Sequence, residues 1–372
     1  MNKGSKRELG FLKLLYSIDG IGPQKIFSLL AKYHSFENIF SANYSSLIEV
    51  EGISKTLAGK ILSSGTNFFS FLENLDKELC SIEKIGAEII TFWDDDYPER
   101  LKNIYYPPLI LYIKGSKEVL KKDSIAIVGT REPTNYGKYI AEKFAQELAE
   151  NNLAIVSGLA RGIDSISHSA TIKKSGKTIA VIGCGLDFIY PPENKKLYED
   201  ISNNGCLVSE YELGTKPDAQ NFPRRNRIIS GISHGTLIVE TKINGGAMQT
   251  AAYALDQGRE VFAIPGPINS KQSDGPNSLI KKGEAKLVIN IDDILSELRF
   301  ISNIKKDSAK PAFVELDLFE EKIYNLLSTE PLHIDEISIQ SSINTSECLV
   351  HLLTLEFKGL IRQLPGKMFV RF

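Results

Sequence analysis

Residues 124–144 hold the stretch that decides the fold, S-I-A-I-V-G-T-R-E-P-T-N-Y-G-K-Y-I-A-E-K-F. An apolar run leads into Gly129, and an amphipathic helical pattern follows soon after. A dinucleotide-binding α/β domain usually begins this way, but the second glycine of that fingerprint is missing here. Arg131 stands near the point where the backbone would have to approach a pyrophosphate. The sequence therefore predicts a related fold that holds a different ligand.

Short apolar runs alternate with helical patterns throughout residues 124–299. The runs are rich in β-branched residues and lack polar alternation, which indicates strands that are buried on both faces. This alternation predicts a Rossmann-like, doubly wound and mostly parallel sheet, in which ligands bind beyond the carboxyl ends of the strands. The predicted strands are residues 125–129, 153–158, 178–183, 206–210, 236–240, 260–266 and 286–290.

Two smaller domains are expected on either side of the sheet. Glycine-containing turns at residues 17–26 and 48–61 lie between helical patterns and resemble a tandem helix-hairpin-helix, or SAM-like, bundle. Such glycines either expose N–H groups to a phosphate or belong to a module used for protein contacts, and the sequence leaves both open. We expect a helical domain at 1–92, the sheet domain at 93–300 with a lead-in at 93–123, a linker at 301–312 and a winged helix at 313–372.

The expected winged helix is acidic. It reads as three helices followed by a hairpin with a P-G turn, and from residue 313 onward it has five basic and nine acidic residues, a net charge of 5 − 9 = −4. A helix that reads a DNA groove needs phosphate-neutralising charge nearby. The candidate recognition helix, N-T-S-E-C-L-V-H-L-L-T-L-E-F-K-G-L, offers one lysine. We therefore favour a protein-contact role for this domain.

Composition and charge exclude several classes of protein. The 372 residues carry a net charge of −2, so a nucleic-acid partner would have to meet a local basic patch. No apolar run has the roughly eighteen residues of a membrane span, and the basic N-terminus lacks the apolar core of a signal peptide, so we expect a cytoplasmic protein. Four scattered cysteines predict buried small hydrophobes rather than disulfides or metal ligands.

The loop Gly129-Thr130-Arg131 has the features of an anion site. It combines a tight turn, a hydroxyl and a guanidinium beside a helix N-terminus, whose N–H groups and dipole favour negative charge. The alternative is an arginine paired with a nearby carboxylate. The second predicted strand ends in Ser157-Gly158 without the acidic residue that would bind a ribose, so neither NAD nor FAD is expected, and we assign no cofactor.

A second basic stretch reads T-K-P-D-A-Q-N-F-P-R-R-N-R-I-I-S-G. Arg224, Arg225 and Arg227 stand at a predicted helix start, where they oppose the helix dipole and one another unless an anion compensates. Phe222 just before them suits a strand whose bases stack while its phosphates are held. Asn226 and Arg227 could instead brace adjacent loops.

Further candidates lie at other helix starts. Ser157-Gly158 and Gly245-Gly246 suit backbone contact with phosphate, or they are simply tight strand-to-helix turns. Lys195 could extend the basic surface. Catalytic groups are few: His168 and His234 have no accompanying nucleophile elbow or paired carboxylates, and no phosphate-binding G-x-x-x-x-G-K-[ST] loop occurs. We therefore expect a binding protein rather than an enzyme, without a metal.

Taken together, these segments resemble the DprA, or Smf, family of bacterial DNA-processing proteins. The resemblance covers the sheet domain, and the Y-P-E-R-L lead-in, the helical bundle and the winged helix agree with the family's layout. It rests on I-V-G-T-R-E-P-T-N-Y-G, S-G-L-A-R-G-I-D, A-V-I-G-C-G-L-D-F-I-Y-P-P-E-N, N-F-P-R-R-N-R-I-I-S-G and N-G-G-A-M-Q-T-A.

The resemblance implies a single-stranded DNA-binding recombination mediator. Proteins of this family coat incoming single strands in natural transformation, form homodimers through the Rossmann-like domain and help to load RecA. The resemblance assigns DNA contacts to Gly129, Thr130 and Arg131, and further contacts to Phe222, Arg224, Asn226 and Arg227. The winged helix varies within the family, so its role here stays open.

Two other functions remain as alternatives. Nucleotide phosphoribohydrolases of the lysine-decarboxylase-like type share a Rossmann-like sheet and a loop G-G-x-G-T-x-x-E, whose acid acts on the ribosyl bond. The corresponding G-G-A-M-Q-T-A-A has Met248 and Gln249 and lacks that acid. A winged-helix transcription factor would bind specific duplex sequences, which the acidic C-terminal domain disfavours.

Overall fold

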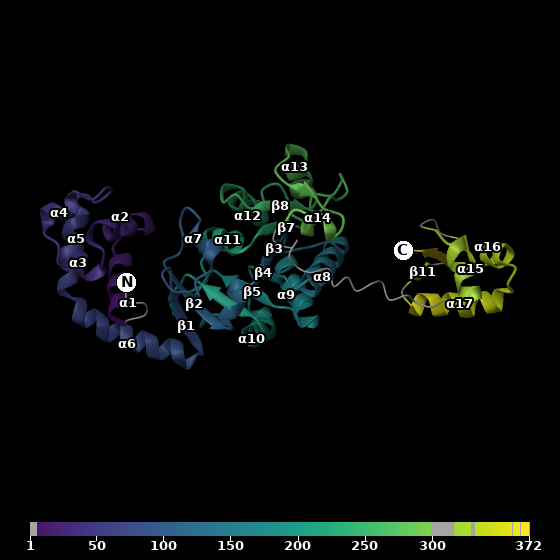
Figure 1. Ribbon diagram of the computed structural model, residues 1–372, viewed down its shortest axis with the longest axis horizontal. Helices are drawn as coiled ribbons and strands as arrows, with labels where there is room; N and C mark the ends of the chain where they lie inside the picture. The colour runs from purple at the N-terminus through teal and green to yellow at the C-terminus, as the bar shows by residue number, and fades with distance from the viewer. Residues whose placement is uncertain (1–5, 299–315, 329–331, 359, 365, 372) are drawn as a thin grey trace. The chain divides into compact units, whose positions relative to one another are not determined.

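The computed structural model describes residues 6–298, 316–328, 332–358, 360–364 and 366–371. The chain divides into two compact units, Met1–Arg299 and Phe300–Phe372 (Figure 1). The first unit holds a helical bundle and a large sheet, and the second unit holds a small helical domain with a hairpin. The linker predicted at 301–312 lies outside the described residues.

The large sheet has nine strands in the order β1-β2-β6-β5-β4-β3-β7-β8-β9. Strands β3 to β9 pair in parallel, whereas β1, β2 and β6 are joined by antiparallel pairs. The order reverses between β3 and β7, so the doubly wound, mostly parallel sheet is confirmed. The strands are β1 Ala87–Thr91, β2 Ile110–Gly115, β3 Ser124–Val128, β4 Ala154–Ser157, β5 Thr178–Ile182, β6 Cys206–Ser209, β7 Gly235–Ile238, β8 Glu260–Ala263 and β9 Lys286–Leu287.

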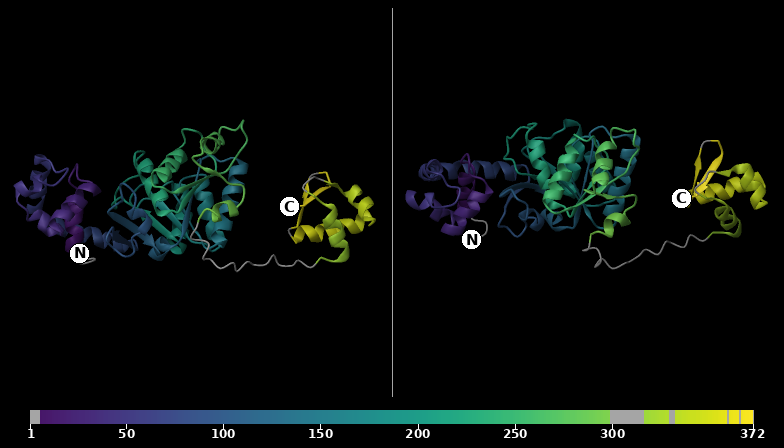
Figure 2. Two further views of the ribbon diagram at one scale, coloured as in Figure 1. Left: turned by 45° about the horizontal axis from the view of Figure 1, so that its top comes forward. Right: turned by 90° about the horizontal axis from the view of Figure 1, so that it is seen from above.

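Helices cover both faces of this sheet (Figures 1 and 2). Successive residues of β3 point to opposite faces, and all of them are buried, which explains the unbroken apolar run. Val128 packs in one cluster with Ile228 and Ile229 of the helix α11. The helices are α7 Glu99–Lys102, α8 Asn135–Glu150, α9 Ile163–Lys173, α10 Lys195–Asn204, α11 Asn221–Ile232, α12 Gly246–Asp256, α13 Asp274–Lys282 and α14 Asp292–Leu295.

The helical bundle precedes the sheet and packs against it. Lys13 of α1 is 4% exposed; its Nζ donates to Tyr112 Oη of β2 at 3.0 Å and pairs with Glu212 at 2.9 Å. Glu78 of α6 completes this network. The bundle comprises α1 Lys6–Tyr16, α2 Pro23–Tyr33, α3 Phe36–Phe40, α4 Tyr44–Ile48, α5 Lys55–Thr66 and α6 Phe68–Lys84. None of the helices that the structure describes is long and apolar enough to cross a membrane.

Several findings differ from the sequence analysis, in which neither β1 nor β2 was among the predicted strands. The boundary expected after residue 92 leaves β1 with the bundle, although β1 pairs with β2 as an edge strand of the sheet. Four of the five residues of β1 are only half-buried, so the strand lacks the continuous apolar run of the inner strands. The cysteines are all free, but Cys80 is exposed on α6, whereas Cys184, Cys206 and Cys348 are buried as expected.

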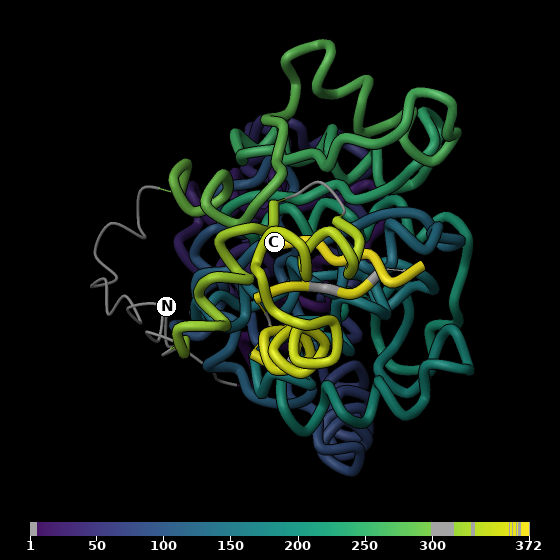
Figure 3. Tube along the Cα trace, turned by 90° about the vertical axis from the view of Figure 1, so that its right-hand side faces the viewer, coloured from purple at the N-terminus to yellow at the C-terminus, as the bar shows by residue number. Residues whose placement is uncertain are grey.

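The second unit is a winged helix, as predicted (Figures 1 and 3). Ile323, Ile337, Leu352 and Phe369 meet in its core. A short strand that the sequence analysis did not predict joins the hairpin, giving the sheet order β10-β12-β11. Its elements are α15 Leu318–Leu326, β10 Leu332–His333, α16 Ile334–Ser341, α17 Thr345–Phe357, β11 Ile361–Leu364 and β12 Met368–Arg371.

Candidate nucleic-acid interface

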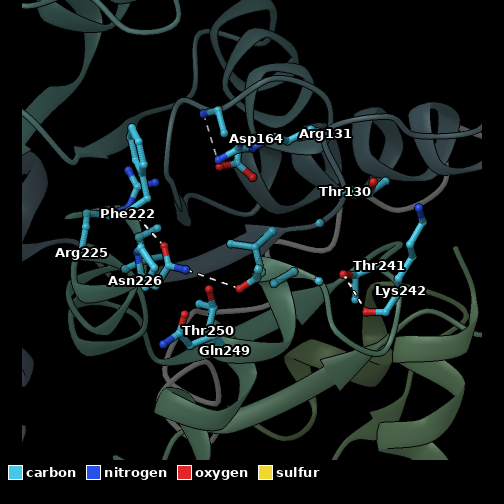
Figure 4. A pocket seen from close by; sticks show the side chains of 18 of the residues that line it. Thr130, Arg131, Asp164, Phe222, Arg225, Asn226, Thr241, Lys242, Gln249 and Thr250 are labelled. Carbon is cyan, nitrogen blue, oxygen red and sulfur yellow. Dashed lines mark hydrogen bonds between the residues drawn. The ribbon is translucent and has the colours of Figure 1, made fainter. Parts of the chain in front are cut away.

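A cavity of about 740 Å³ opens at the carboxyl ends of β3, β4 and β7 (Figure 4). The strands β3 and β7 flank the point where the strand order reverses, which is where doubly wound sheets bind ligands. The N-termini of α11 and α12 form its other walls. We call it the strand-end cavity. Seven of the predicted site residues line it: Gly129, Thr130, Arg131, Phe222, Asn226, Gly245 and Gly246.

The loop that carries Arg131 is held by Glu240, the second residue after β7. Thr130 N donates to Glu240 O at 2.6 Å. Thr134 N and Oγ1 donate to the two carboxylate oxygens of Glu240 at 2.9 Å and 2.6 Å. A Cβ on Gly129 would lie 2.6 Å from Ile163 Cγ1 and 2.9 Å from Glu240 O, so only glycine fits there. Glu240 is 2% exposed and therefore serves as a fixed anchor for the loop.

Arg131 is exposed in the cavity wall. Its Cζ lies 6.0 Å from the centroid of the Phe222 ring, which is the distance of a cation–π contact. Among the described residues, no carboxylate comes within ion-pair distance of its guanidinium. The alternative from the sequence analysis, an arginine paired with a nearby carboxylate, therefore does not hold for these residues. The guanidinium can therefore meet an anion in the cavity.

Phe222 lies in the first turn of α11 and forms an aromatic wall. Its ring lies 5.4 Å from the ring of Tyr190, with 30° between their planes. A Cβ on Gly183 would come within 2.9 Å of Phe222, so that glycine gives the ring its space. Asn226, one turn further along α11, donates to Gly246 O at 3.4 Å and so links α11 to the start of α12. The ring faces of Phe222 and Tyr190 can stack a planar group such as a nucleobase.

The three arginines of the basic stretch have different environments. Arg224 is exposed but does not line the cavity. Arg225 is buried, with Nη1 donating to Gly158 O at 2.8 Å and to Val181 O, so it joins α11 to the ends of β4 and β5. Arg227 pairs with Glu210 at 2.5 Å, and both side chains are largely buried, at 16% and 14% exposed. Arg227 was predicted to contact DNA; the structure instead makes it a brace between α11 and the end of β6.

Burial shifts the pKa values of the charged pair beneath the cavity. It raises the pKa of the Asp164 carboxyl, a shift that Arg225 opposes. It also lowers the pKa of Arg225 to about 10, against the effect of Asp164. Asp164 Oδ2 accepts the N–H of Gly158 at 3.1 Å and of Ala160 at 3.4 Å. This carboxylate therefore shapes the loop after β4 rather than presenting a free acid to the cavity.

The remaining predicted residues divide between structural and peripheral positions. Ser157 is buried and its hydroxyl donates to Ile127 O at 2.7 Å, so it is not available to a ligand, contrary to the prediction. Gly158 lines a smaller recess together with Arg131, Tyr190 and Phe222. Lys195 is exposed at the start of α10 and does not line the strand-end cavity.

Gly245 and Gly246 place the N-terminus of α12 in the cavity wall. No side chain caps this helix, so its first N–H groups are left to solvent or to a ligand. Negative charge is favoured at such an end by the helix dipole. Arg131 and this helix end line the same cavity, so both can meet an anion there.

Several lining residues were missed by sequence reasoning. Lys242 is exposed in the loop after β7 and adds a cation, and Thr241 precedes it. Both residues follow the carboxyl end of a predicted strand, where doubly wound sheets bind ligands. The same position after a strand pointed to Gly129, so it would also have pointed to residues 241–242. Gln249 and Thr250 also line the cavity on α12.

The two histidines singled out from the sequence have structural partners. His168 Nδ1 lies 2.6 Å from Thr178 Oγ1, whose hydroxyl donates to Ile155 O at 2.7 Å. Since that hydroxyl has one hydrogen, Nδ1 must be the donor to it. Burial lowers the pKa of His168 to about 3. His234 Nδ1 accepts the N–H of Ser124 at 3.2 Å, and burial lowers its pKa likewise.

In the part of the chain that the structure describes, one group of side chains has the spacing of metal ligands. Asp317, Glu320 and His351 of the winged helix offer atoms within 4.8 Å of one another. Glu320 Oε2 already accepts from Asp317 N at 2.9 Å and from Lys358 Nζ at 2.6 Å. The group therefore forms a helix-capping box with an ion pair.

Three descriptions of known families match the chain. Residues 88–299 match DNA recombination-mediator protein A, residues 307–367 match the DprA winged helix domain, and residues 11–64 match a SAM-like helix-hairpin-helix tandem. The chain is 32% identical to Protein Smf of Synechocystis over 95% of this chain and 96% of that protein. It is 44% identical to DNA processing protein DprA of Bacillus subtilis over 61% of this chain and 77% of that protein.

Two solved structures are similar to this chain. The X-ray structure of DNA processing protein A from Streptococcus pneumoniae has a TM-score of 0.67 at 36% identity, and the match covers 80% of this chain and 99% of that one. DNA processing protein A of Helicobacter pylori, solved to show its single-stranded DNA binding mode, has a TM-score of 0.52 at 34% identity; the match covers 57% of this chain and 96% of that one.

Proposed function

The chain belongs to the DNA recombination-mediator protein A family, also named DprA or Smf, and we propose that it binds single-stranded DNA in the strand-end cavity. The observation that carries the proposal is the meeting of Arg131, from the loop after β3, and Phe222, from the first turn of α11, in one cavity although they are more than ninety residues apart in sequence. A cation for the phosphate and a ring for the base are what an unpaired nucleotide needs. The binding mode of the Helicobacter pylori relative supports the choice of ligand.

Each part of the cavity has a role in this proposal. Arg131 and the N-terminus of α12 at Gly245-Gly246 hold phosphates, with Gly129 and Thr130 shaping the loop. Phe222 stacks a base, and Asn226 faces the same space. Arg224 and Lys195, exposed outside the cavity, attract the strand as it leaves. A duplex keeps its bases stacked inside, so a recessed aromatic ring favours the single strand.

We propose further that the protein acts as a homodimer that loads RecA on single strands during natural transformation. The large sheet ends at β9, and beside this edge Leu287 and Ile289 are 43% and 67% exposed, which suits an apolar contact between copies. Sedimentation should show a dimer that Ile289→Asp weakens. The protein should also shorten the lag of RecA assembly on single strands, and an unaltered lag would exclude this role.

The DNA-binding proposal is tested by titrating single-stranded and duplex oligonucleotides at several salt concentrations. We expect Arg131→Ala to weaken single-strand binding about tenfold for every base composition, because a lost phosphate contact is independent of sequence. The slope of log K against log salt should fall by about 0.7, the value for one phosphate contact on a single strand.

Arg7→Ala is the matched control, because Arg7 is an exposed arginine of the helical bundle paired with Glu37. It should leave affinity and slope unchanged. If Arg131→Ala and Arg7→Ala change the affinity and the salt slope equally, the strand-end cavity is not the DNA-binding site. Release of free base from nucleoside monophosphates would instead favour the phosphoribohydrolase alternative.

A further inference from the structure

The central part of α17 carries apolar side chains both toward the core and toward solvent. Leu352 and Leu355 lie in the core of the winged helix and are 0% exposed. Leu349, Val350 and Leu353 lie on the solvent side and are 40%, 63% and 54% exposed. A helix that is apolar all round is normally buried on both sides. The outer side of α17 thus lacks a cover among the described residues.

Phe319 of a second helix lies outside this surface. Phe319 of α15 is 56% exposed, but its ring stacks on His351 of α17 with 5.6 Å between centroids, and at about 100° per residue His351 projects roughly 160° from Leu353. Clustered exposed apolar side chains mark interaction sites, whereas scattered ones are ordinary. We call Leu349, Val350 and Leu353 the α17 face.

DNA does not fit this face. In a winged helix, α17 has the position of the recognition helix, but residues 345–357 contain no lysine or arginine. The nearest cation along the chain, Lys358, pairs with Glu320 at 2.6 Å. Arg371 lies over the ring of Tyr324 at 4.0 Å. Phosphate recognition needs free cations close to the helix, and among the described residues α17 itself supplies none.

The acidic residues of α17 flank its apolar stripe. At about 100° per residue, Glu347 and Glu356 project roughly 120° and 60° to opposite sides of Leu353. Glu347 is exposed, with Oε2 accepting from Asn344 Nδ2 at 2.8 Å, and Glu356 is half-buried, with Oε1 accepting from Gln363 N at 2.9 Å. Because residues 313–372 carry a net charge of −4, a second copy of this domain would be repelled as DNA would.

We propose that the α17 face binds a basic amphipathic helix of a different protein. Apolar residues of that helix cover Leu349, Val350 and Leu353, and its lysines or arginines face Glu347 and Glu356. This is the groove-type recognition of an apolar stripe with charge complementarity at its edges. The interaction adds a protein partner to a chain whose DNA site lies in its first unit.

The experiment uses the full chain and two labelled model peptides of fourteen residues with the same leucine stripe, one carrying lysines and the other glutamates. Fluorescence anisotropy measures binding to the protein and to the double variant Val350→Thr/Leu353→Gln. The lysine peptide should bind, and the double variant should weaken it about tenfold or more, because two apolar contacts are lost. The glutamate peptide should not bind.

Ile339→Gln is the matched control, since Ile339 is 78% exposed on α16 and outside the α17 face. It should change peptide affinity less than twofold. Glu347→Gln should weaken the lysine peptide two- to threefold at low salt and not at high salt. All variants should keep the urea unfolding transition of the wild-type winged helix, which shows that this domain is folded. They should also keep their affinity for single-stranded DNA, which separates this proposal from the DNA site.

Other results would overturn the proposal. One is an equal loss with Ile339→Gln, and another is binding of the glutamate peptide. Self-association that the double variant abolishes would make a second copy the occupant. Binding of duplex DNA that the same variant abolishes would make DNA the occupant.

Discussion

The strand-end cavity lies where doubly wound sheets bind ligands, and the α17 face lies where winged helices read DNA, yet the two surfaces offer opposite chemistry. The cavity presents Arg131, Lys242 and an aromatic ring beside an uncapped helix N-terminus. The α17 face presents leucine and valine between two glutamates. The difference teaches that a fold supplies the position of a site, whereas the exposed side chains select its ligand.

The largest effect should come from distorting the Arg131 loop through Gly162→Ala. Gly162 has φ of 76°, and a Cβ there would collide with Thr130 O and lie 2.7 Å from the carbonyl carbon of Arg131. We expect single-strand affinity to fall roughly 30-fold, since about 2 kcal/mol of strain must be relieved by moving this loop. Lysine-peptide binding at the α17 face should not change.

Gly258→Ala is the control for this variant. Gly258 also has a positive φ, 64°, but nothing lies within 4 Å of its Cβ position. It should cost stability without loss of DNA affinity, as measured by urea unfolding and by titration. Wild-type affinity for single-stranded DNA in Gly162→Ala would contradict the proposed role of the Arg131 loop. It would also weaken the contrast between the strand-end cavity and the α17 face.

A smaller effect should appear as pH dependence of the unit that carries the cavity. His168 titrates at about 3 in the folded chain, against 6.5 when unfolded, so the unfolded chain binds more protons between these pH values. Stability is therefore unaffected by His168 above pH 6.5 and falls as the pH drops toward 3. From pH 6.5 to 5 the loss should be roughly 2 kcal/mol in the free energy of unfolding.

Urea unfolding of His168→Gln at both pH values checks this. The variant should lose most of that pH dependence, although it is less stable at neutral pH because of the Thr178 contact. His34→Asn serves as the control, because His34 is exposed in a left-handed conformation that asparagine tolerates. If the free energy of unfolding of His168→Gln depends on pH as strongly as that of the wild type, His168 is not held neutral in the folded chain.

The smallest effect on single-strand affinity is expected from removing residues 313–372. Single-strand affinity should stay within a factor of about two, because the cations that we propose to hold phosphate lie in the first unit. Binding of the lysine peptide should be lost. A tenfold loss of DNA affinity in this truncation would break the comparison, since the acidic domain would then contribute to the DNA site.

Much of the architecture could be predicted because it depends on local patterns. Inner strands such as β3 are buried on both faces, and this leaves an unbroken apolar run in the sequence. The edge strand β1 is half-exposed and leaves no such run, so it was missed. The strand β2 was missed too, although residues 110–113 are buried, because it was assigned to the lead-in before the sheet. The loops after β3 and before α12 were found because strand ends and helix starts can be located from such patterns.

The sequence by itself determined the sheet, its flanking domains and the loops where a ligand should be sought, because apolar periodicity and glycine positions are local. Only the tertiary structure decided which cations face that ligand. Arg225 and Arg227 stand in the same basic stretch as Arg224, but Gly158, Val181 and Glu210, distant in sequence, turn them into internal braces. Burial and pairing depend on such distant partners, and no local pattern records them.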